Sequence, residues 1–308
     1  MGGEEHHDVV VIGGGPSGVS CALECFDMQL DVVVVEAGPA LGGQLGEIPH
    51  SVRNVAAGRF EDGHALERAL QESSGMLGEC VRLAHPVTGA HLGDRWIEAD
   101  SKRFAARALV IATGTARAQL PAAVDGAFGG DITYQLESEP QRFVGREVAV
   151  IGGGDSATLD ALALAQTGST VKLVHRSDAL TARHDIVEQV RNEPNVEDLP
   201  GWELEATRGA DQLEEIGLVR PATGERRVIP VRGLIVKIAR VPRTQLFAGQ
   251  LELDRSGAIV VDGDLHTSQR GVFAAGDVVS GAYPRVAAAF GSGLLAARSS
   301  LRYLEGRS

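Results

Sequence analysis

The sequence predicts an α/β fold with two βαβ units, because the same local pattern occurs twice along the chain. In each case an apolar run ends at a glycine-rich turn, and a helix-like stretch follows. A length of 308 residues and a hydrophobic content of 44% suffice for one large domain, or two of about 150 residues, with buried cores. The two turns are Gly13-Gly14-Gly15-Pro16-Ser17-Gly18 and Gly152-Gly153-Gly154-Asp155-Ser156-Ala157.

The first unit has all three elements of a βαβ motif. Asp8 to Ile12 is predicted to be a fully buried parallel strand, and Ser17 to Met28 a helix. A second strand, Asp31 to Val35, ends at an acid, Glu36. The polar residues before the first strand indicate a solvated terminus.

The glycines and the acid of this unit match a dinucleotide site. Gly13 permits a tight turn, Gly15 lets the backbone approach a pyrophosphate, and Gly18 lets the helix pack close to the strand. The helix N-terminus would face the phosphates, and Glu36 would accept hydrogen bonds from the adenosine ribose. Strand, helix and terminal acid together favour a nucleotide site over a purely structural turn.

The second unit repeats the pattern with a different ending. Glu147 to Ile151 is predicted to be a strand, Ser156 to Gln166 a helix, and Thr170 to Val174 the next strand. That strand ends at His175-Arg176 and not at an acid. Because no carboxylate repels a 2′-phosphate and Arg176 can pair with one, NADP is favoured over NAD, although a solvated arginine is the alternative. Arg183 is a second candidate cation.

Other segments are read from their patterns. Gly58 to Gly75 is predicted to be largely helical, and Val81 to Arg107 to form short strands of a covering antiparallel layer. Arg220 to Glu225 is predicted to be a turn between two strands. Gly271 to Ala275 is a buried strand, and the glycine after it lets Asp277 approach a ligand, unless that acid is only a cap.

Charge and the first residues exclude several classes. Lysine and arginine total 29 against 41 acidic residues, a net charge of −12, which argues against nucleic acid or an anionic membrane as partner. The polar opening and the short first apolar run predict neither a signal peptide nor a membrane span. We therefore expect a cytoplasmic protein.

Three cysteines are too few, and wrongly spaced, for a disulfide framework or a zinc site. Cys21 and Cys25 lie four apart on the predicted first helix and are interpreted as small core residues. His6 and His7 are adjacent and cannot share a helix face, so no metal site is predicted there.

Several motifs resemble the low-molecular-weight thioredoxin reductase family over nearly the whole chain. They are Gly42-Gly43-Gln44, Ala112-Thr113-Gly114, Gly152 to Ala157, His175-Arg176 and Gly271 to Asp277. The resemblance implies two Rossmann-like three-layer ββα domains, with an NADPH domain inserted into an FAD domain. The expected segments are 1–117 and 243–308 for FAD and 118–242 for NADPH, with Pro121 and Pro242 at the crossings.

The resemblance also implies site residues. Those expected to bind FAD are Gly13, Gly15, Pro16, Ser17, Gly18, Glu36, Ala37, Gly43, Gln44, Leu45, Asn54, Ala112, Thr113, Gly114, Gly276, Asp277, Arg285 and Val286. Those expected to bind NADPH are Gly152, Gly154, Asp155, Ser156, Ala157, His175, Arg176 and Arg183.

The departures from the family shape the predicted activity. The redox-active Cys-x-x-Cys of thioredoxin reductases has no counterpart in Asp125 to Tyr134, which contains no cysteine. The chain therefore resembles more closely the cysteine-free ferredoxin or flavodoxin–NADP reductases, which keep an aromatic residue where Tyr134 stands and a segment like Phe290-Gly291. No catalytic residue is assigned, and Tyr134 and Arg285 are candidates near the flavin.

We expect an FAD-dependent NAD(P)H oxidoreductase that passes electrons to a small redox protein or a small molecule without an enzyme dithiol. Two alternatives stay open: a flavoenzyme acting on a dedicated small molecule, and an FAD-binding redox sensor without turnover. Ala239 to Thr244 differs from the family's nicotinamide-site motif, and its Arg240 and Arg243 either bind an anion or form a charged surface. The resemblance also implies a homodimer.

Overall fold

The computed structural model describes residues 3–56, 58–118, 120, 128, 130–136, 140–238 and 240–307. The chain divides into two compact units, one made of Met1–Ala116 with Val241–Ser308 and the other of Arg117–Arg240. The expected crossing at Pro121, and Ala239, lie outside the described residues, as does much of the cysteine-free stretch that begins at Asp125. None of the helices in the described part is long and apolar enough to cross a membrane.

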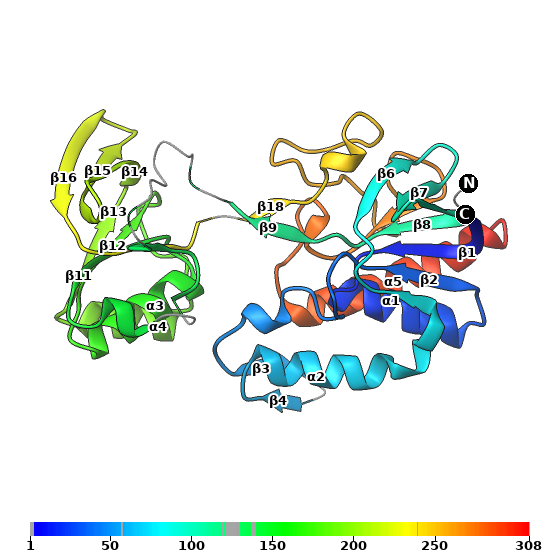
Figure 1. Cartoon of the computed structure of the whole chain (residues 1–308), viewed down its shortest axis with the longest axis horizontal. Helices are drawn as coiled ribbons and strands as arrows, with labels where there is room; N and C mark the ends of the chain where they lie inside the picture. Colours follow the sequence, from blue (N-terminus) through cyan, green and yellow to red (C-terminus); the bar gives the residue numbers. More distant parts are fainter. Residues whose placement is uncertain are drawn as a thin grey trace. The chain divides into compact units, whose positions relative to one another are not determined.

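The first unit is built on a sheet in the order β5-β2-β1-β8-β7-β6, with β19 also paired to β8 (Figure 1). β1, β2, β8 and β19 run parallel, and their apolar runs are buried on both faces. The strands are β1 (Glu4–Ile12), β2 (Val32–Val35), β5 (Val81–Arg82), β6 (Val87–His91), β7 (Trp96–Ala99), β8 (Lys102–Ile111) and β19 (Val272–Ala274).

Two helices, α1 (Pro16–Asp27) and α5 (Val286–Leu304), pack together against one face of this sheet. Their contact is close, because a Cβ at Gly293 would lie 2.1 Å from the carbonyl oxygen of Ser17. A separate core, which includes Phe104 and Phe247, covers the other face. The unit also contains β3 (Val52–Val55), β4 (Gly58–Phe60), α2 (Gly63–Ser73) and the short helices Leu45–Glu47, Ser74–Cys80, Gln245–Phe247 and Gly276–Val278.

The second unit has three layers. A parallel sheet in the order β10-β17-β11-β12-β13 packs on one side against α3 and α4, and on the other against the antiparallel sheet β14-β15-β16 (Figure 1). The elements are β10 (Ile132–Thr133), β11 (Glu147–Ile151), α3 (Asp155–Gln166), β12 (Thr170–His175), α4 (His184–Asn192), β13 (Val196–Pro200), β14 (Glu203–Gly209), β15 (Leu213–Arg220), β16 (Glu225–Pro230), β17 (Leu234–Val236) and the short helix Pro140–Phe143.

Two further strands, β9 (Thr115–Arg117) and β18 (Arg240–Pro242), form a two-stranded sheet. They carry the two boundaries between the units, at residues 116/117 and 240/241. Next to this pair, the amide of Arg243 donates to the carbonyl oxygen of Gly114 at 3.0 Å. The segments that enter and leave the second unit are thus neighbours.

Most predicted elements are confirmed, and three segments differ. Val81 to Arg107 does not form a separate antiparallel layer, because its strands belong to the main sheet, where β5 and β8 pair in parallel with β2 and β1 and only β6-β7-β8 pair in antiparallel. β1 starts at Glu4, and its His6 and His7 pair with Ala105 and Ala106 of β8, so the expected terminal segment is part of a strand. The His6 side chain is exposed, as expected, whereas that of His7 is only 14% exposed. Within the stretch expected to be helical, β4 comes first and α2 starts only at Gly63. The side chain of Asp62 caps that helix by accepting from the amide of Ala65 at 2.7 Å.

Candidate functional site

The turn between β1 and α1, which we call the first cradle (Gly13–Gly18), requires glycine at both ends. Gly13 has a φ of +107°, and a Cβ there would lie 2.5 Å from the carbonyl oxygen of Ala112. A Cβ at Gly18 would lie 1.9 Å from the carbonyl oxygen of Gly13. Any larger residue would therefore push α1 away from the sheet.

The helix that leaves the first cradle has an open N-terminus. Gly15 is its N-cap residue and supplies no side chain to bond the first-turn amides, and Pro16 follows at the first helical position. The nearest atom to a Cβ built on Gly15 is the Cα of Gly43, at 3.9 Å. Nothing is therefore closer to Gly15 than ordinary van der Waals contact, and uncapped amides at a helix N-terminus fit a pyrophosphate, so the residues present suit the dinucleotide.

Glu36 stands at the end of β2 with both carboxylate oxygens engaged. Oε2 accepts from the amide of Gly14 at 2.5 Å, and Oε1 accepts from the amide of Gly38 at 2.6 Å. A carboxylate can accept about four hydrogen bonds, so each oxygen keeps capacity for a ribose hydroxyl. Glu36 therefore suits the role expected of it and also joins the β2 end to the glycine turn.

Other residues expected to bind FAD gather near this cradle. The side-chain amide of Gln44 donates to the carbonyl oxygen of Thr115 at 2.7 Å, which ties the Gly43 loop to the segment that follows β8. Gly276 touches the cradle from the far end of the sequence, since a Cβ there would lie 2.3 Å from Oγ of Ser17. Asp277 lines a cavity of about 460 Å³ beside the start of α5.

Three of the expected residues have other placements. Leu45 is buried in the core between the sheet and α1, so only its backbone is available to a ligand. Asn54 lies on the exposed side of β3. Arg285 is the N-cap residue of α5, and its guanidinium lies over the ring of Tyr283 at 5.1 Å.

The turn between β11 and α3, which we call the second cradle (Gly152–Ala157), has the same construction. Gly152 has a φ of +138°, and a Cβ there would lie 2.3 Å from the carbonyl oxygen of Lys237. Gly154 is the N-cap residue of α3 and supplies no side-chain cap. A Cβ on Gly154 would meet nothing closer than Oγ1 of Thr181, at 3.9 Å. This turn also suits a pyrophosphate.

The loop that follows β12 folds back over the second cradle. The amide of Thr181 donates to the carbonyl oxygen of Gly153 at 2.8 Å. The amide of Arg183 donates to Oδ1 of Asp155 at 2.8 Å, and the Arg183 guanidinium lies 3.5 Å from the same carboxylate. Asp155 and Arg183, both expected to bind NADPH, therefore bind each other and fix the loop.

At the end of β12 the His175 side chain is buried, whereas that of Arg176 is exposed. The His175 side chain is 2% exposed, and its Nε2 lies 2.8 Å from Oδ1 of Asp198 on β13, a partner that the sequence motifs did not reveal. Its Nδ1 is buried without a hydrogen-bond partner in the described residues. Arg176 is exposed at the same strand end, which leaves its guanidinium accessible to a phosphate.

Tyr134 belongs to the second unit. Its ring packs beside the core that contains Trp202 and Leu234, and its hydroxyl accepts from the amide of Leu120 at 2.9 Å. These contacts account for an aromatic residue here as a packing element; its place near a flavin stays a prediction.

The cysteines provide no exposed dithiol. Cys21 and Cys25 are both 0% exposed on α1, which confirms them as core residues, and Cys80 is half-buried elsewhere. A hydrogen bond with Cys25, together with burial, raises the pKa of the Cys21 thiol well above its usual value. The Cys21 thiol is therefore held in its unreactive form.

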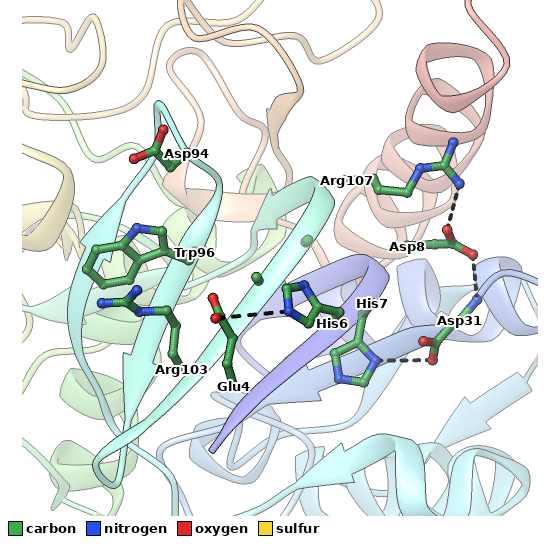
Figure 2. A pocket seen from close by; sticks show the side chains of 11 residues that line it. Glu4, His6, His7, Asp8, Asp31, Asp94, Trp96, Arg103 and Arg107 are labelled. Atoms are coloured by element: carbon green, nitrogen blue, oxygen red, sulfur yellow. Dashed lines mark hydrogen bonds and ion pairs between the residues drawn. The ribbon is translucent and has the colours of Figure 1, made fainter. Parts of the chain in front are cut away.

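A second cavity, of about 590 Å³, lies at the opposite ends of the first unit's strands (Figure 2). Nδ1 of His7 lies 3.1 Å from Asp31, and Arg107 lies 2.7 Å from Asp8. No group of three metal-ligating side chains occurs among the described residues. The cavity is lined by Glu4, His6, His7, Asp8, Asp31, Asp94, Trp96, Arg103, Ala105, Ala106 and Arg107.

One buried ion pair stands beside the second cradle and was not anticipated. Nζ of Lys237 lies 3.0 Å from Oδ2 of Asp160, and the two side chains are 7% and 8% exposed. The only sequence signal is a lysine directly after the apolar strand β17, which a solvated residue would explain equally well.

Comparison with known proteins adds the family context. A family model described as pyridine nucleotide-disulphide oxidoreductase matches residues 7–293. A thioredoxin reductase of Mycolicibacterium smegmatis is 31% identical over 309 residues, 97% of this chain and 96% of that protein. A 34.2 kDa protein in the rubredoxin operon of Clostridium pasteurianum is 27% identical and covers 99% of both chains. The crystal structure of Lactococcus lactis thioredoxin reductase matches with a TM-score of 0.86 at 27% identity, over 97% of this chain and 99% of that one.

Proposed function

The chain belongs to the pyridine nucleotide-disulphide oxidoreductase family, in its thioredoxin reductase-like group, and from this premise we propose that it passes electrons from NADPH through FAD to an acceptor without an enzyme dithiol. It is a flavin-dependent NAD(P)H oxidoreductase of a family that typically binds FAD and NAD(P)H. What the proposal adds is the cofactor preference, the assignment of each cofactor to a unit, and the route to the acceptor.

The observation that carries the proposal is the combination of two open cradles with the state of the cysteines. In each cradle the helix N-terminus has no side-chain cap, and its N-cap glycine has no neighbour closer than ordinary van der Waals contact. The chain has three cysteines, of which Cys21 and Cys25 are buried in one helix and Cys80 stands alone. Cys21 and Cys25 cannot meet a protein disulfide without local unfolding of α1. Reducing equivalents therefore leave from the flavin itself.

We assign FAD to the first unit because Glu36 ends β2 with spare acceptor capacity for a ribose. We assign NADPH to the second because the corresponding strand ends in the exposed Arg176, which can pair with a 2′-phosphate. Bound FAD would accept a pair of electrons and release them singly, which a nicotinamide cannot do. The protein's own contribution is to bind and orient the two nucleotides; no side-chain acid or nucleophile is required.

The test is anaerobic stopped-flow mixing of the purified yellow protein with NADPH and, separately, with NADH. We expect fast bleaching of the flavin absorbance by NADPH and slower bleaching by NADH. The reduced protein is then mixed with ferredoxin, flavodoxin, rubredoxin, a quinone and a small disulfide. If neither nucleotide bleaches the bound flavin, the proposal is wrong and a role as a redox sensor is favoured.

A second candidate, a flavoenzyme for a dedicated small molecule, is favoured by the exposed Arg243, which directly follows β18. Its guanidinium can pair with an anionic group of a substrate. If this candidate is right, NADPH should bleach the flavin absorbance slowly, and one anionic substrate should oxidise or reduce the flavin quickly. The homodimer implied by the resemblance is likewise a proposal, which sedimentation equilibrium of the purified protein would check.

A further inference from the structure

We propose that Lys237 neutralises Asp160 beneath the nicotinamide half of the second cradle, so that the oxidised cofactor is not retained more tightly than the reduced one. This inference rests on the proposed function, since it requires that NADPH bind the second unit. It concerns the ion pair between Lys237 and Asp160, which belongs to neither the glycine motif nor the set of residues expected to bind NADPH.

The order of the strands places this pair on the nicotinamide side. In open α/β sheets a dinucleotide lies across the carboxyl ends of the strands, at the point where the chain order reverses. Here β11 stands between β12 on one side and β17 on the other. β12, with Arg176 after it, takes the adenosine half. The carboxyl end of β17 therefore lies under the other half, and Lys237 is the first residue after β17.

Lys237 is held close to the cradle by its backbone. Its amide donates to the carbonyl oxygen of Ile151, the last residue of β11, at 2.8 Å. Its own carbonyl oxygen packs against Gly152, where a Cβ would lie only 2.3 Å away. Its ammonium turns inward to Asp160 in the second turn of α3. Both residues are thus carried by segments that adjoin the second cradle: Lys237 by the backbone packed on Gly152, and Asp160 by the helix that starts at the cradle.

The charge of a buried group at this position matters for one chemical reason. Reduced and oxidised nicotinamide differ by one positive charge on the ring, because a hydride carries away two electrons and one proton. A buried, unpaired carboxylate nearby would attract the oxidised ring, and low-dielectric surroundings strengthen that attraction. Lys237 at 3.0 Å cancels this field. The pair therefore sets the preference between the two redox forms and favours release of the product.

The test compares binding of two ligands to the oxidised holoprotein by isothermal titration calorimetry. The ligands are NADP⁺ and 1,4,5,6-tetrahydro-NADP, whose ring is neutral and cannot donate a hydride. The quantity followed is the ratio of their dissociation constants. Because the ratio compares two ligands on the same protein, a general loss of affinity or stability cancels.

Lys237→Met removes the ammonium that lies 3.0 Å from the Asp160 carboxylate. It is expected to tighten NADP⁺ binding relative to the reduced analogue by about tenfold, ~1.4 kcal/mol. Asp160→Asn removes the carboxylate that faces the Lys237 ammonium and is expected to move the ratio in the opposite direction. The double variant removes both charges and should restore the native ratio. The double variant also keeps the test possible if a single variant fails to fold, because removing one partner of a buried ion pair is strongly destabilising.

Lys172→Met is the matched control, because Lys172 forms an ion pair with Glu197 on the same sheet, away from the cradle. It should leave the ratio unchanged, as should Lys237→Arg. Shifts of equal sign in the two single variants, or no shift in either, would overturn the inference. If native protein binds neither ligand, the proposed function itself fails, which is a separate outcome.

Discussion

Glu36 Oε2 accepts a hydrogen bond of 2.5 Å from the backbone amide of Gly14, so the acid that ends β2 also holds the glycine turn of the first cradle. Replacing it by alanine removes both an acceptor for the ribose and a support of the turn. We expect Glu36→Ala to weaken FAD binding by about tenfold to a hundredfold, the usual cost of losing a charged hydrogen bond. The ratio of flavin to protein absorbance after purification measures this. Glu98→Ala, an exposed acid on β7, should keep full flavin content.

Gly13 provides a direct test of the close approach between β1 and the segment after β8. A methyl group there would meet the carbonyl oxygen of Ala112 at 2.5 Å, in a backbone conformation that side chains rarely adopt. We expect Gly13→Ala to destabilise the protein by about 2–4 kcal/mol and to lower its flavin content. Gly75→Ala is the control, since a Cβ there would meet nothing within 4 Å. Equal melting temperatures for the two variants would contradict the packing argument.

Arg176 should determine the preference for NADPH. Its exposed guanidinium stands at the end of β12, where the first unit has an acid. Arg176→Ala is expected to raise the NADPH concentration for half-maximal flavin reduction by about tenfold or more, with little effect on NADH. Arg191→Ala removes an exposed arginine from α4 and should change neither value. If the concentrations needed for half-maximal flavin reduction rise equally for NADPH and NADH, the 2′-phosphate is bound by other residues.

The cysteines should be dispensable. We expect the variant that carries Cys21→Ala, Cys25→Ala and Cys80→Ala to keep flavin reduction by NADPH and turnover with a one-electron acceptor within about threefold of the native rates. In native protein, a thiol reagent at pH 8 should label Cys80 at most, because Cys21 and Cys25 are fully buried. Loss of turnover with the flavin still reducible would indicate that a thiol takes part.

The hydrogen bonds of Asp254 should make the free energy of unfolding depend on pH. Hydrogen bonds from the hydroxyl groups of Ser256, at 2.6 Å, and Ser280, at 2.5 Å, hold the pKa of this carboxyl well below its usual range. A depressed native pKa stabilises the fold above about pH 4, the unfolded pKa, and this stability is lost as the pH falls further. Asp254→Asn should therefore be less stable than native protein at pH 7 in urea, and the difference should narrow toward pH 3. A constant difference would contradict the assignment.

Local sequence signals sufficed where a residue's role is set by its immediate neighbours. The valine runs of β1 and β2 could be identified because both faces are buried. Gly13 and Gly152 could be identified because the tight turn requires glycine, and Gly18 because the helix must approach the strand. His6 and His7 were misjudged because their polarity hid a pairing with β8, almost a hundred residues away. A backbone ladder can extend a strand beyond its apolar part.

Long-range side-chain pairs could not be predicted. Asp198 meets His175 across two strands, and Asp160 meets Lys237 across 77 residues of sequence. Neither acid stands in a motif, and each would be interpreted as solvent-exposed from its neighbours alone. Only the strand order β17-β11-β12-β13, which sets β13 beside β12 and β17 beside β11 and the helix after it, brings the members of each pair together.

The pairing of β9 with β18 has a consequence for how the chain could be rearranged. Because the strands at the two ends of residues 117–240 are hydrogen-bonded neighbours, that segment is a cassette with adjacent entry and exit. Its removal would leave a gap that a short glycine-rich link between Ala116 and Val241 can close. The shortened chain would keep a complete first unit, and the excised segment a complete second one, so each nucleotide site could be titrated on a separate polypeptide.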